Sequence, residues 1–187
     1  MEACRINSCG LKHGINKSVT MKNIKQILFL LPILFLISCM SEPEGRVTVV
    51  KFDSVEPYLN NDNDTIYIIN FWVTSNEVSV GQLPDFEKIR KEYNDENVMV
   101  LLVSLDPAKD KDSKVVPLLK KLGVRSDVML LNDPDTKSWR PKVSPLWNGE
   151  LPATIIYKGN SAEFYQEAMD YNKLKSIVDE RLKNKQN

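Results

Sequence analysis

The chain has 187 residues, of which 42% are apolar and 27% charged, the balance of a globular domain with a core of ordinary size. Its 25 basic and 25 acidic side chains cancel, so the formal net charge is zero and the composition excludes a strong electrostatic footprint for nucleic acid. No stretch reaches the roughly 20 consecutive apolar residues that span a bilayer. We therefore expect one domain, and no nucleic acid among its partners.

The segment before residue 39 has the design of a secretory signal. Residues 21–25 are basic, and residues 27–37 form an apolar run of 11 residues interrupted only by Pro32. The run ends in Leu-Ile-Ser-Cys, which resembles the lipobox of bacterial lipoproteins, where signal peptidase II cuts before a cysteine that carries lipid. We expect residues 21–38 to be a lipoprotein signal peptide and Cys39 to be lipidated. The alternative is an ordinary signal peptide with a chance cysteine.

Residues 1–20 fit no signal design, because they contain Cys4, Cys9 and His13 but no apolar core. We expect translation to start at Met21, which makes residues 1–20 a non-native upstream extension. Residues 39–46 are expected to form a polar tether and residues 47–187 the folded domain. Met40 follows the cysteine in place of an aspartate, which favours a lipid anchor in the outer membrane over the inner one; the orientation toward periplasm or surface is left open.

The chain from Cys39 onward has a restricted set of reactive groups. Removing residues 1–38 takes away five of the 25 basic residues and one of the 25 acids, which leaves a net charge of −4. One cysteine remains, Cys39 itself, and no histidine remains. Chemistry that needs a free thiol or an imidazole is therefore not available to the domain.

Apolar runs predict most of the strands. Residues 65–73 are almost all β-branched or aromatic, which is typical of a central strand buried on both faces, and residues 98–104 follow the same pattern. Residues 84–93 instead repeat apolar side chains at the spacing of an amphipathic helix. We expect strands over 47–52, 65–73, 98–104, 128–131, 153–157 and 161–165, and helices over 84–93, 114–122 and 171–182.

Capping residues indicate where two of these helices begin or end. Gly123 is placed to end the helix over 114–122, and Asp170 to cap the last helix. Residues 53–64 are expected to form a short helix or turn and then a loop, 106–113 a charged loop, 133–135 a turn, and 145–152 an irregular segment.

The order of elements and three motifs resemble the TlpA/ResA group of envelope thioredoxin-like proteins. Residues 70–84 read NFWVTSNEVSVGQLP and align without a gap to that group's N-F-W-A-T-W-C-x-x-C-x-x-E-L-P. Residues 103–106 (VSLD) and 151–154 (LPAT) match as well, the second resembling the group's cis-proline loop with Pro152 as the cis residue. The resemblance implies an α/β thioredoxin-like fold, βαβ and ββα halves around a mixed sheet, and thiol–disulfide oxidoreductase activity.

The departures from that pattern fall on the chemistry. Asn76 stands where the nucleophilic cysteine is expected, Ser79 where the resolving cysteine is expected, and Gln82 in place of a buried glutamate that helps to move protons. Disulfide exchange needs one thiolate to attack and a second thiol to resolve the mixed disulfide. An amide and a hydroxyl supply neither, so we expect no redox activity; Asn76 is instead suited to cap the helix that follows.

Other chemistries find little support in the sequence. Ser79 lacks a histidine base, and Glu77 is the one acid near it. Asp106, Asp110 and Asp112 offer oxygen ligands for calcium, but lysines alternate with them, which favours a solvated loop. We expect no metal and no cofactor.

The groove beside the proline loop is the feature that the resemblance leaves in place. It implies a binding surface around Trp72, Trp147, Leu151 and Pro152, with Trp147 equally consistent with core packing and Trp139 expected in the core. The sequence predicts a redox-inactive lipoprotein of the cell envelope that binds a protein or peptide partner. The alternatives are an active thiol–disulfide oxidoreductase and a scaffold that acts through another surface.

Overall fold

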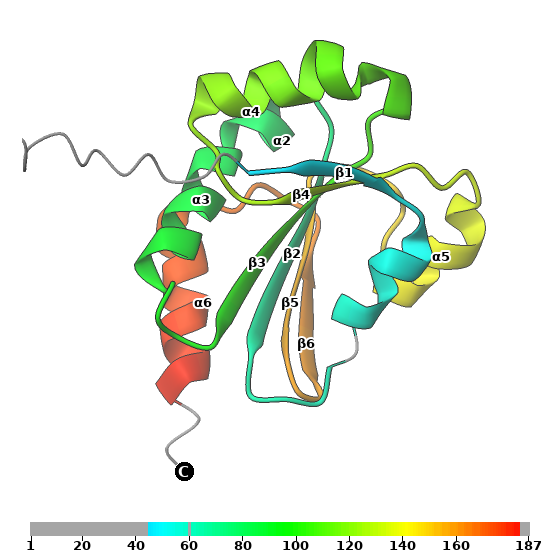
Figure 1. Cartoon of the computed structure of the whole chain (residues 1–187). Helices are drawn as coiled ribbons and strands as arrows, with labels where there is room; N and C mark the ends of the chain where they lie inside the picture. Colours follow the sequence, from blue (N-terminus) through cyan, green and yellow to red (C-terminus); the bar gives the residue numbers. More distant parts are fainter. Residues whose placement is uncertain (1–44, 60, 184–187) are drawn as a thin grey trace, which may run out of the picture. The chain divides into compact units, whose positions relative to one another are not determined.

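One mixed sheet of six strands organises the part of the chain that the computed structural model describes, residues 45–59 and 61–183 (Figure 1). The order across the sheet is β1-β4-β3-β2-β5-β6. β1, β4, β3 and β2 run parallel, and β5 and β6 are antiparallel. The strands are β1 (Val47–Val50), β2 (Ile66–Trp72), β3 (Val98–Ser104), β4 (Val128–Leu131), β5 (Ala153–Lys158) and β6 (Ser161–Tyr165).

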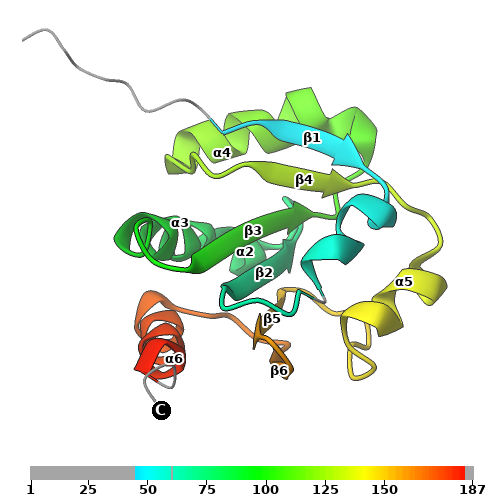
Figure 2. The ribbon, with the colours of Figure 1, turned by 60° about the horizontal axis from the view of Figure 1, so that its bottom comes forward.

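Three helices cover one face of this sheet: α3 (Leu83–Glu92), α4 (Val116–Leu122) and α6 (Tyr171–Lys183). Figure 2 shows α3 and α6 side by side, with α4 near β1 and β4. Their apolar stripes meet the even-numbered side chains of β2, which alternate with the odd-numbered ones that face the other way. The core on this face includes Ile66, Ile68, Trp72, Phe86, Ile89, Leu119, Leu174 and Val178.

The opposite face is covered by two short 3₁₀ turns, η2 (Phe52–Ser54) and η3 (Glu56–Tyr58), and by helix α5 (Thr136–Val143). The expected first strand therefore ends at Val50 rather than Phe52, because the Phe52 ring turns into the core and stacks on Trp139 at 5.5 Å between ring centroids. Because both faces are covered, all seven residues of β2 are buried, as its continuous apolar run predicts.

The expected charged loop over 106–113 is wrong for most of its length. A 3₁₀ turn, η4 (Ala108–Asp110), passes into a π-helical turn, η5 (Lys111–Val115), and then into α4. Charged side chains cover the solvent side of this helical segment while Val115 is fully buried beneath it. Gly123 ends α4 in the left-handed conformation, with φ +67°, as expected of a glycine in that position.

Helix α5 was not predicted by the sequence pattern, which indicated only a turn and a short segment. Its N-cap Asp135 accepts a hydrogen bond from the backbone N–H of Ser138 at 3.3 Å. Trp139 and Val143, one turn apart, are both buried. Two buried side chains and a cap are thus enough to hold eight residues in a helix despite Pro141 inside it.

Several expectations fall on residues outside the described ranges. These are the upstream extension 1–20, the signal peptide 21–38, the lipidated Cys39 and most of the tether 39–46. Among the helices of residues 45–59 and 61–183, none combines the length and hydropathy needed to cross a membrane.

Candidate functional site at the edge of strands β2, β3 and β5

Three chain segments meet at the end of the sheet where β2 and β3 have their carboxyl termini, and this end is called the edge below. β2 and β3 are parallel neighbours with Trp72 opposite Ser104, so their carboxyl ends reach the same edge. β5 runs antiparallel to β2 with Ala153 opposite Phe71, so β5 begins where β2 ends. The fold therefore brings the start of helix α2 (Glu77–Gly81), the segment after β3 and the 145–152 loop to one place.

Asn76 joins two of these segments. Its Oδ1 accepts a hydrogen bond from the backbone N–H of Ser79 at 2.9 Å, which makes Asn76 the N-cap of α2. Its Nδ2 donates to the backbone carbonyl of Leu151 at 3.1 Å. The cap was expected from the sequence, whereas the bond to Leu151 spans 75 residues and has no local sequence signal.

Ser79 and Gln82 are both buried rather than presented to solvent. The Ser79 side chain has no exposed surface, and its Oγ has no hydrogen-bond partner among the described residues. Gln82 is 4% exposed, and its Oε1 accepts from the backbone N–H of Met169 at 3.0 Å. Gln82 thereby ties the start of α3 to the segment before α6. Neither residue offers an accessible nucleophile or an exchangeable proton to a substrate.

The 145–152 loop presents its last residues at this edge. The peptide bond between Leu151 and Pro152 is cis, Pro152 is buried, and Leu151 is half-buried. Asn76 occupies the carbonyl of Leu151, while the N–H of Leu151 has no hydrogen-bond partner within residues 45–59 and 61–183. One backbone donor of the loop thus has no acceptor among the described residues.

Contacts within the loop hold it in place. The indole N–H of Trp147 donates to the carbonyl of Glu150 at 2.9 Å. Gly149 adopts φ +104°, and a Cβ at this position would lie 2.7 Å from Nη1 of Arg140. Because this backbone angle lies in the region that favours glycine, a larger residue at position 149 would strain the loop and would also have to displace the guanidinium of Arg140.

The tryptophans proposed for the binding surface lie in the two cores. Trp72 is fully buried on the α3 face, and its Nε1 has no partner among the described residues. Trp147 is 6% exposed and packs against Phe71 at 4.8 Å and Trp139 at 5.8 Å between ring centroids. In this conformation neither Trp72 nor Trp147 presents its ring at the surface, and contact of these residues with a partner stays a prediction. Trp147 packs in the same core as Trp139, which is buried as expected.

Asp106 is a site residue that the sequence analysis placed in a charged loop. It is 3% exposed, and its carboxylate accepts hydrogen bonds from the backbone N–H of Thr74 at 3.0 Å and from the hydroxyls of Thr74 and Ser104 at 2.5 and 2.8 Å. These bonds fix the segment between β2 and α2. The signal that could have found it is its position two residues past a buried strand that ends at this edge.

Two large apolar side chains are exposed on the segments that Asn76 links. Val78, on α2, is 57% exposed, and Leu146, in the 145–152 loop, is 78% exposed. Val78 lies between Asn76 and Ser79 in the chain. The two segments joined by the bond from Asn76 to Leu151 thus each carry one exposed apolar side chain.

Oxygen ligands do not gather into a metal site here. In the part of the chain that the structure describes, no three His, Cys, Asp or Glu side chains are placed to hold an ion. The acids considered for calcium have other contacts, since Lys114 is 3.0 Å from Asp110 and Asp106 is satisfied by Thr74 and Ser104.

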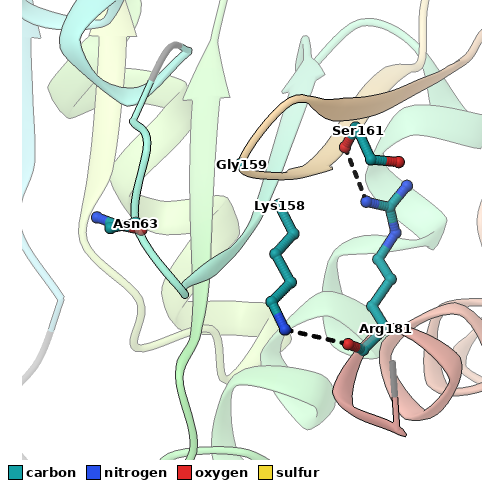
Figure 3. A pocket seen from close by; sticks show the side chains of 5 residues that line it. All are labelled: Asn63, Lys158, Gly159, Ser161 and Arg181. Atoms are coloured by element: carbon teal, nitrogen blue, oxygen red, sulfur yellow. Dashed lines mark hydrogen bonds between the residues drawn. The ribbon is translucent and has the colours of Figure 1, made fainter. Parts of the chain in front are cut away.

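A hollow lies at the other end of β5, around the turn into β6 (Figure 3). It has a volume of about 310 Å³ and is lined by Asn63, Lys158, Gly159, Ser161 and Arg181. Its cations are engaged: Lys158 is 3.1 Å from Asp64, and Arg181 is 3.0 Å from Glu163. Because both positive charges are already paired, this hollow has no clear ligand chemistry.

The buried carboxylate of Glu87 lies away from this edge, on α3. Burial acts to raise the pKa of Glu87, but hydrogen bonds from Arg90 at 2.7 Å and Ser126 at 2.6 Å outweigh it, so the pKa is lowered. Glu87 therefore stays ionised and connects α3 to the segment before β4, which is a structural role.

No family model matches the chain, and no curated protein matches it. Solved structures do: a DsbF homologue from Corynebacterium diphtheriae is 15% identical over 64% of this chain and 73% of that one, with TM-score 0.52. A putative thioredoxin from Neisseria meningitidis is 23% identical, covering 68% and 79%, with TM-score 0.51. A thiol:disulfide interchange protein of the thioredoxin family from Chlorobium tepidum is 17% identical, covering 76% and 98%, with TM-score 0.51.

The described domain has the thioredoxin fold. The fold class predicted from the sequence is thus confirmed, with its mixed sheet between helical layers. At these identities the likeness establishes the fold alone. In this thioredoxin-fold domain no residue between 45 and 183 is a cysteine, since all three cysteines of the chain precede it.

Proposed function

We propose that this protein is a redox-inactive, TlpA/ResA-like thioredoxin-fold lipoprotein that binds an extended segment of a protein partner in the cell envelope. The observation that carries the proposal is a site without thiols next to a loop that keeps its cis Leu151–Pro152 bond and an unpaired N–H at Leu151. Positions 76 and 79 are Asn and Ser, and Ser79 is fully buried. Thiol–disulfide exchange has no nucleophile here.

The chemistry of the edge supports binding of an extended segment. The free N–H of Leu151 can donate to a partner's backbone carbonyl, as one strand does to the next. The exposed side chains of Val78 and Leu146 supply apolar contact area. The segment that fits is extended and carries apolar side chains next to the residue that pairs with Leu151.

Direct binding to an unfolded probe tests this proposal. Reduced, carboxymethylated α-lactalbumin, which has no free thiols, is labelled and titrated with the full chain while fluorescence anisotropy is recorded. Val78→Asp and Leu146→Asp are each expected to weaken binding about tenfold, because each places a charge in an apolar contact. Val49→Asp is the matched control, since Val49 is also exposed, at 42%, but lies on the edge strand β1.

The outcome separates the three candidate functions. Weakening by Val49→Asp alone would favour a scaffold that uses another surface. Reduction of insulin by dithiothreitol should proceed no faster with the protein than without it, and a clear acceleration would overturn redox inactivity.

The envelope location rests on the signal and lipobox ending at Cys39. A structure with the same fold, at TM-score 0.50, is a secreted thiol-disulfide isomerase from Corynebacterium glutamicum, 14% identical over 63% of this chain and 68% of that one. Labelling with a palmitate analogue in a bacterial host should mark the wild type and not Cys39→Ala, and membrane fractionation should place the label in the outer membrane. Labelling that persists in Cys39→Ala would contradict the anchor.

A further inference from the structure

The side-chain amide of Asn76 performs two separable tasks. Through Oδ1 it caps α2, and through Nδ2 it holds the carbonyl of Leu151. A backbone N–H can bond only to the amide oxygen and a carbonyl only to the amide nitrogen, so the two contacts fix which way the amide faces. A substitution can therefore remove one task and keep the other.

The two backbone groups of Leu151 differ in their hydrogen bonds. A residue that faces a partner strand in an antiparallel pair exchanges both of its backbone hydrogen bonds, one through N–H and one through C=O. In this chain the N–H of Leu151 has no partner among the described residues, while its C=O is taken by Asn76. An extended segment laid along Leu151 therefore meets a carbonyl that already accepts one hydrogen bond, and it competes with Nδ2 of Asn76 for this oxygen.

We propose that Asn76 is a positioning residue that latches the 145–152 loop to α2 and limits how tightly a partner binds. This inference rests on the proposed function, since the partner is the extended segment described there. The segment must either displace Nδ2 of Asn76 from the Leu151 carbonyl or share this oxygen with it, with each donor on its own lone pair. The latch therefore favours segments that need only the N–H of Leu151.

The burial around Asn76 supports this assignment. The neighbouring polar side chains of Ser79 and Gln82 are buried beneath the helix, so Asn76 is the side chain at this turn that reaches the loop. Its helix carries the exposed Val78, and the loop carries the exposed Leu146. The bond from Asn76 thus joins the two segments that carry these side chains.

Two variants separate the latch from the cap. Asn76→Ser and Asn76→Asp both keep an oxygen that can accept from the N–H of Ser79, but serine is too short to reach Leu151 and aspartate has no donor. Asp170→Ser is the matched control, because Asp170 caps α6 by accepting from Lys173 at 2.8 Å and has no bond to the 145–152 loop.

The first measurement is hydrogen exchange of the loop, followed by mass spectrometry. Peptides over 145–152 should exchange about fivefold faster in Asn76→Ser and Asn76→Asp than in the wild type, because one net hydrogen bond holding the loop is lost. Peptides over α2 should be unchanged, since the cap is kept. Equal loop exchange in folded wild type and variants would overturn the latch whether or not any partner binds.

The second measurement is the affinity for carboxymethylated α-lactalbumin. Asn76→Ser and Asn76→Asp should bind the probe about fivefold more tightly than the wild type, and Asp170→Ser should bind it like the wild type. Unchanged or weaker binding by the two Asn76 variants overturns the limit on affinity. Absence of binding in every protein, the wild type included, overturns the proposed function, and the exchange experiment then still decides the latch.

Discussion

The seam between α3 and α6 and the edge around α2 treat polar groups in opposite ways. At the seam, Lys175 lies 2.8 Å from Glu92 and 2.9 Å from the hydroxyl of Tyr93, which in turn donates to Asp179 at 2.5 Å. Lys88 lies over the ring of Tyr171 at 3.3 Å from its centroid. Each of these polar groups has a partner, so the contact between α3 and α6 has a structural role.

The edge around α2 instead leaves buried polar atoms without partners among the described residues. They are Oδ1 of Asn70, Nε1 of Trp72, Oγ of Ser79 and Nε2 of Gln82. A buried polar atom without a hydrogen bond costs roughly 1–3 kcal/mol. Unlike the contact between α3 and α6, the edge around α2 is therefore not optimised for stability alone. This pattern is expected of a functional site.

The largest effect is expected from restoring thiols at the edge. Asn76→Cys with Ser79→Cys should form a disulfide, because a bond requires Cα atoms roughly 4.4–6.8 Å apart and these residues share the first turn of a capped helix. Insulin reduction should rise from background to a measurable rate, and adding Gln82→Glu should increase it further. A folded double variant that stays reduced under oxidant, by thiol titration, would mean that the turn cannot support the reaction geometry.

Asp106→Asn tests how much the edge depends on one buried carboxylate. The amide nitrogen cannot accept from Thr74 or Ser104, so at least one donor loses its acceptor and the free energy of unfolding should fall by about 2 kcal/mol. Urea denaturation measures this. Glu92→Gln, at the exposed part of the seam, should lower the free energy of unfolding by less than Asp106→Asn does, because solvent screens an exposed ion pair. A larger loss at Glu92 than at Asp106 would reverse the comparison.

Glu87→Gln tests a fully paired buried acid by its dependence on pH. Because its pKa is lowered in the folded state, the ionised Glu87 adds stability above the ordinary value near 4.5, and this stability is lost as pH falls through the lower folded pKa. At pH 7 the variant should be less stable by about 1–2 kcal/mol, since two charge-assisted bonds become neutral. The gap to the wild type should close in acid, and a constant gap from pH 7 to pH 2 would contradict the assignment.

The smallest effect is expected at Ser79. Because its buried hydroxyl has no partner among the described residues, Ser79→Ala should leave stability unchanged or raise it by up to about 1 kcal/mol. Thermal unfolding with Ser138→Ala as an exposed comparison measures it. A clear loss of stability would mean that the hydroxyl of Ser79 is hydrogen-bonded in solution.

Local patterns were enough to predict most of the fold. The strands over 98–104, 128–131 and 161–165 have the predicted bounds, because buried runs and turn residues limit them directly. The last helix begins at Tyr171 as predicted, with Asp170 capping it. The segment over 106–113 was misassigned because its residues are mostly charged and show no apolar periodicity, although they form η4 and most of η5.

The site was only partly predictable for a physical reason. The cap at Asn76 is local, and a sequence pattern can indicate it. Two other features depend on the path of the chain over the sheet, which no local pattern indicates. They are the bond from Asn76 to Leu151 and the burial of Trp147. The position of Asp106 after a buried strand is a local signal, but its bonds to Thr74 could not be predicted, because only the pairing of β2 with β3 brings the two residues together.

The edge-to-face contact of Trp147 with Trp139 gives the molecule an intrinsic optical reporter. The two indoles lie 5.8 Å apart at 61° between ring planes, close enough for their excited states to couple, whereas Trp72 lies on the other face of the sheet. Since Trp147 belongs to the 145–152 loop and Trp139 to α5, a displacement of the loop changes the coupling. Near-ultraviolet circular dichroism of the unlabelled chain can therefore follow motion of the loop while the rest of the fold stays in place.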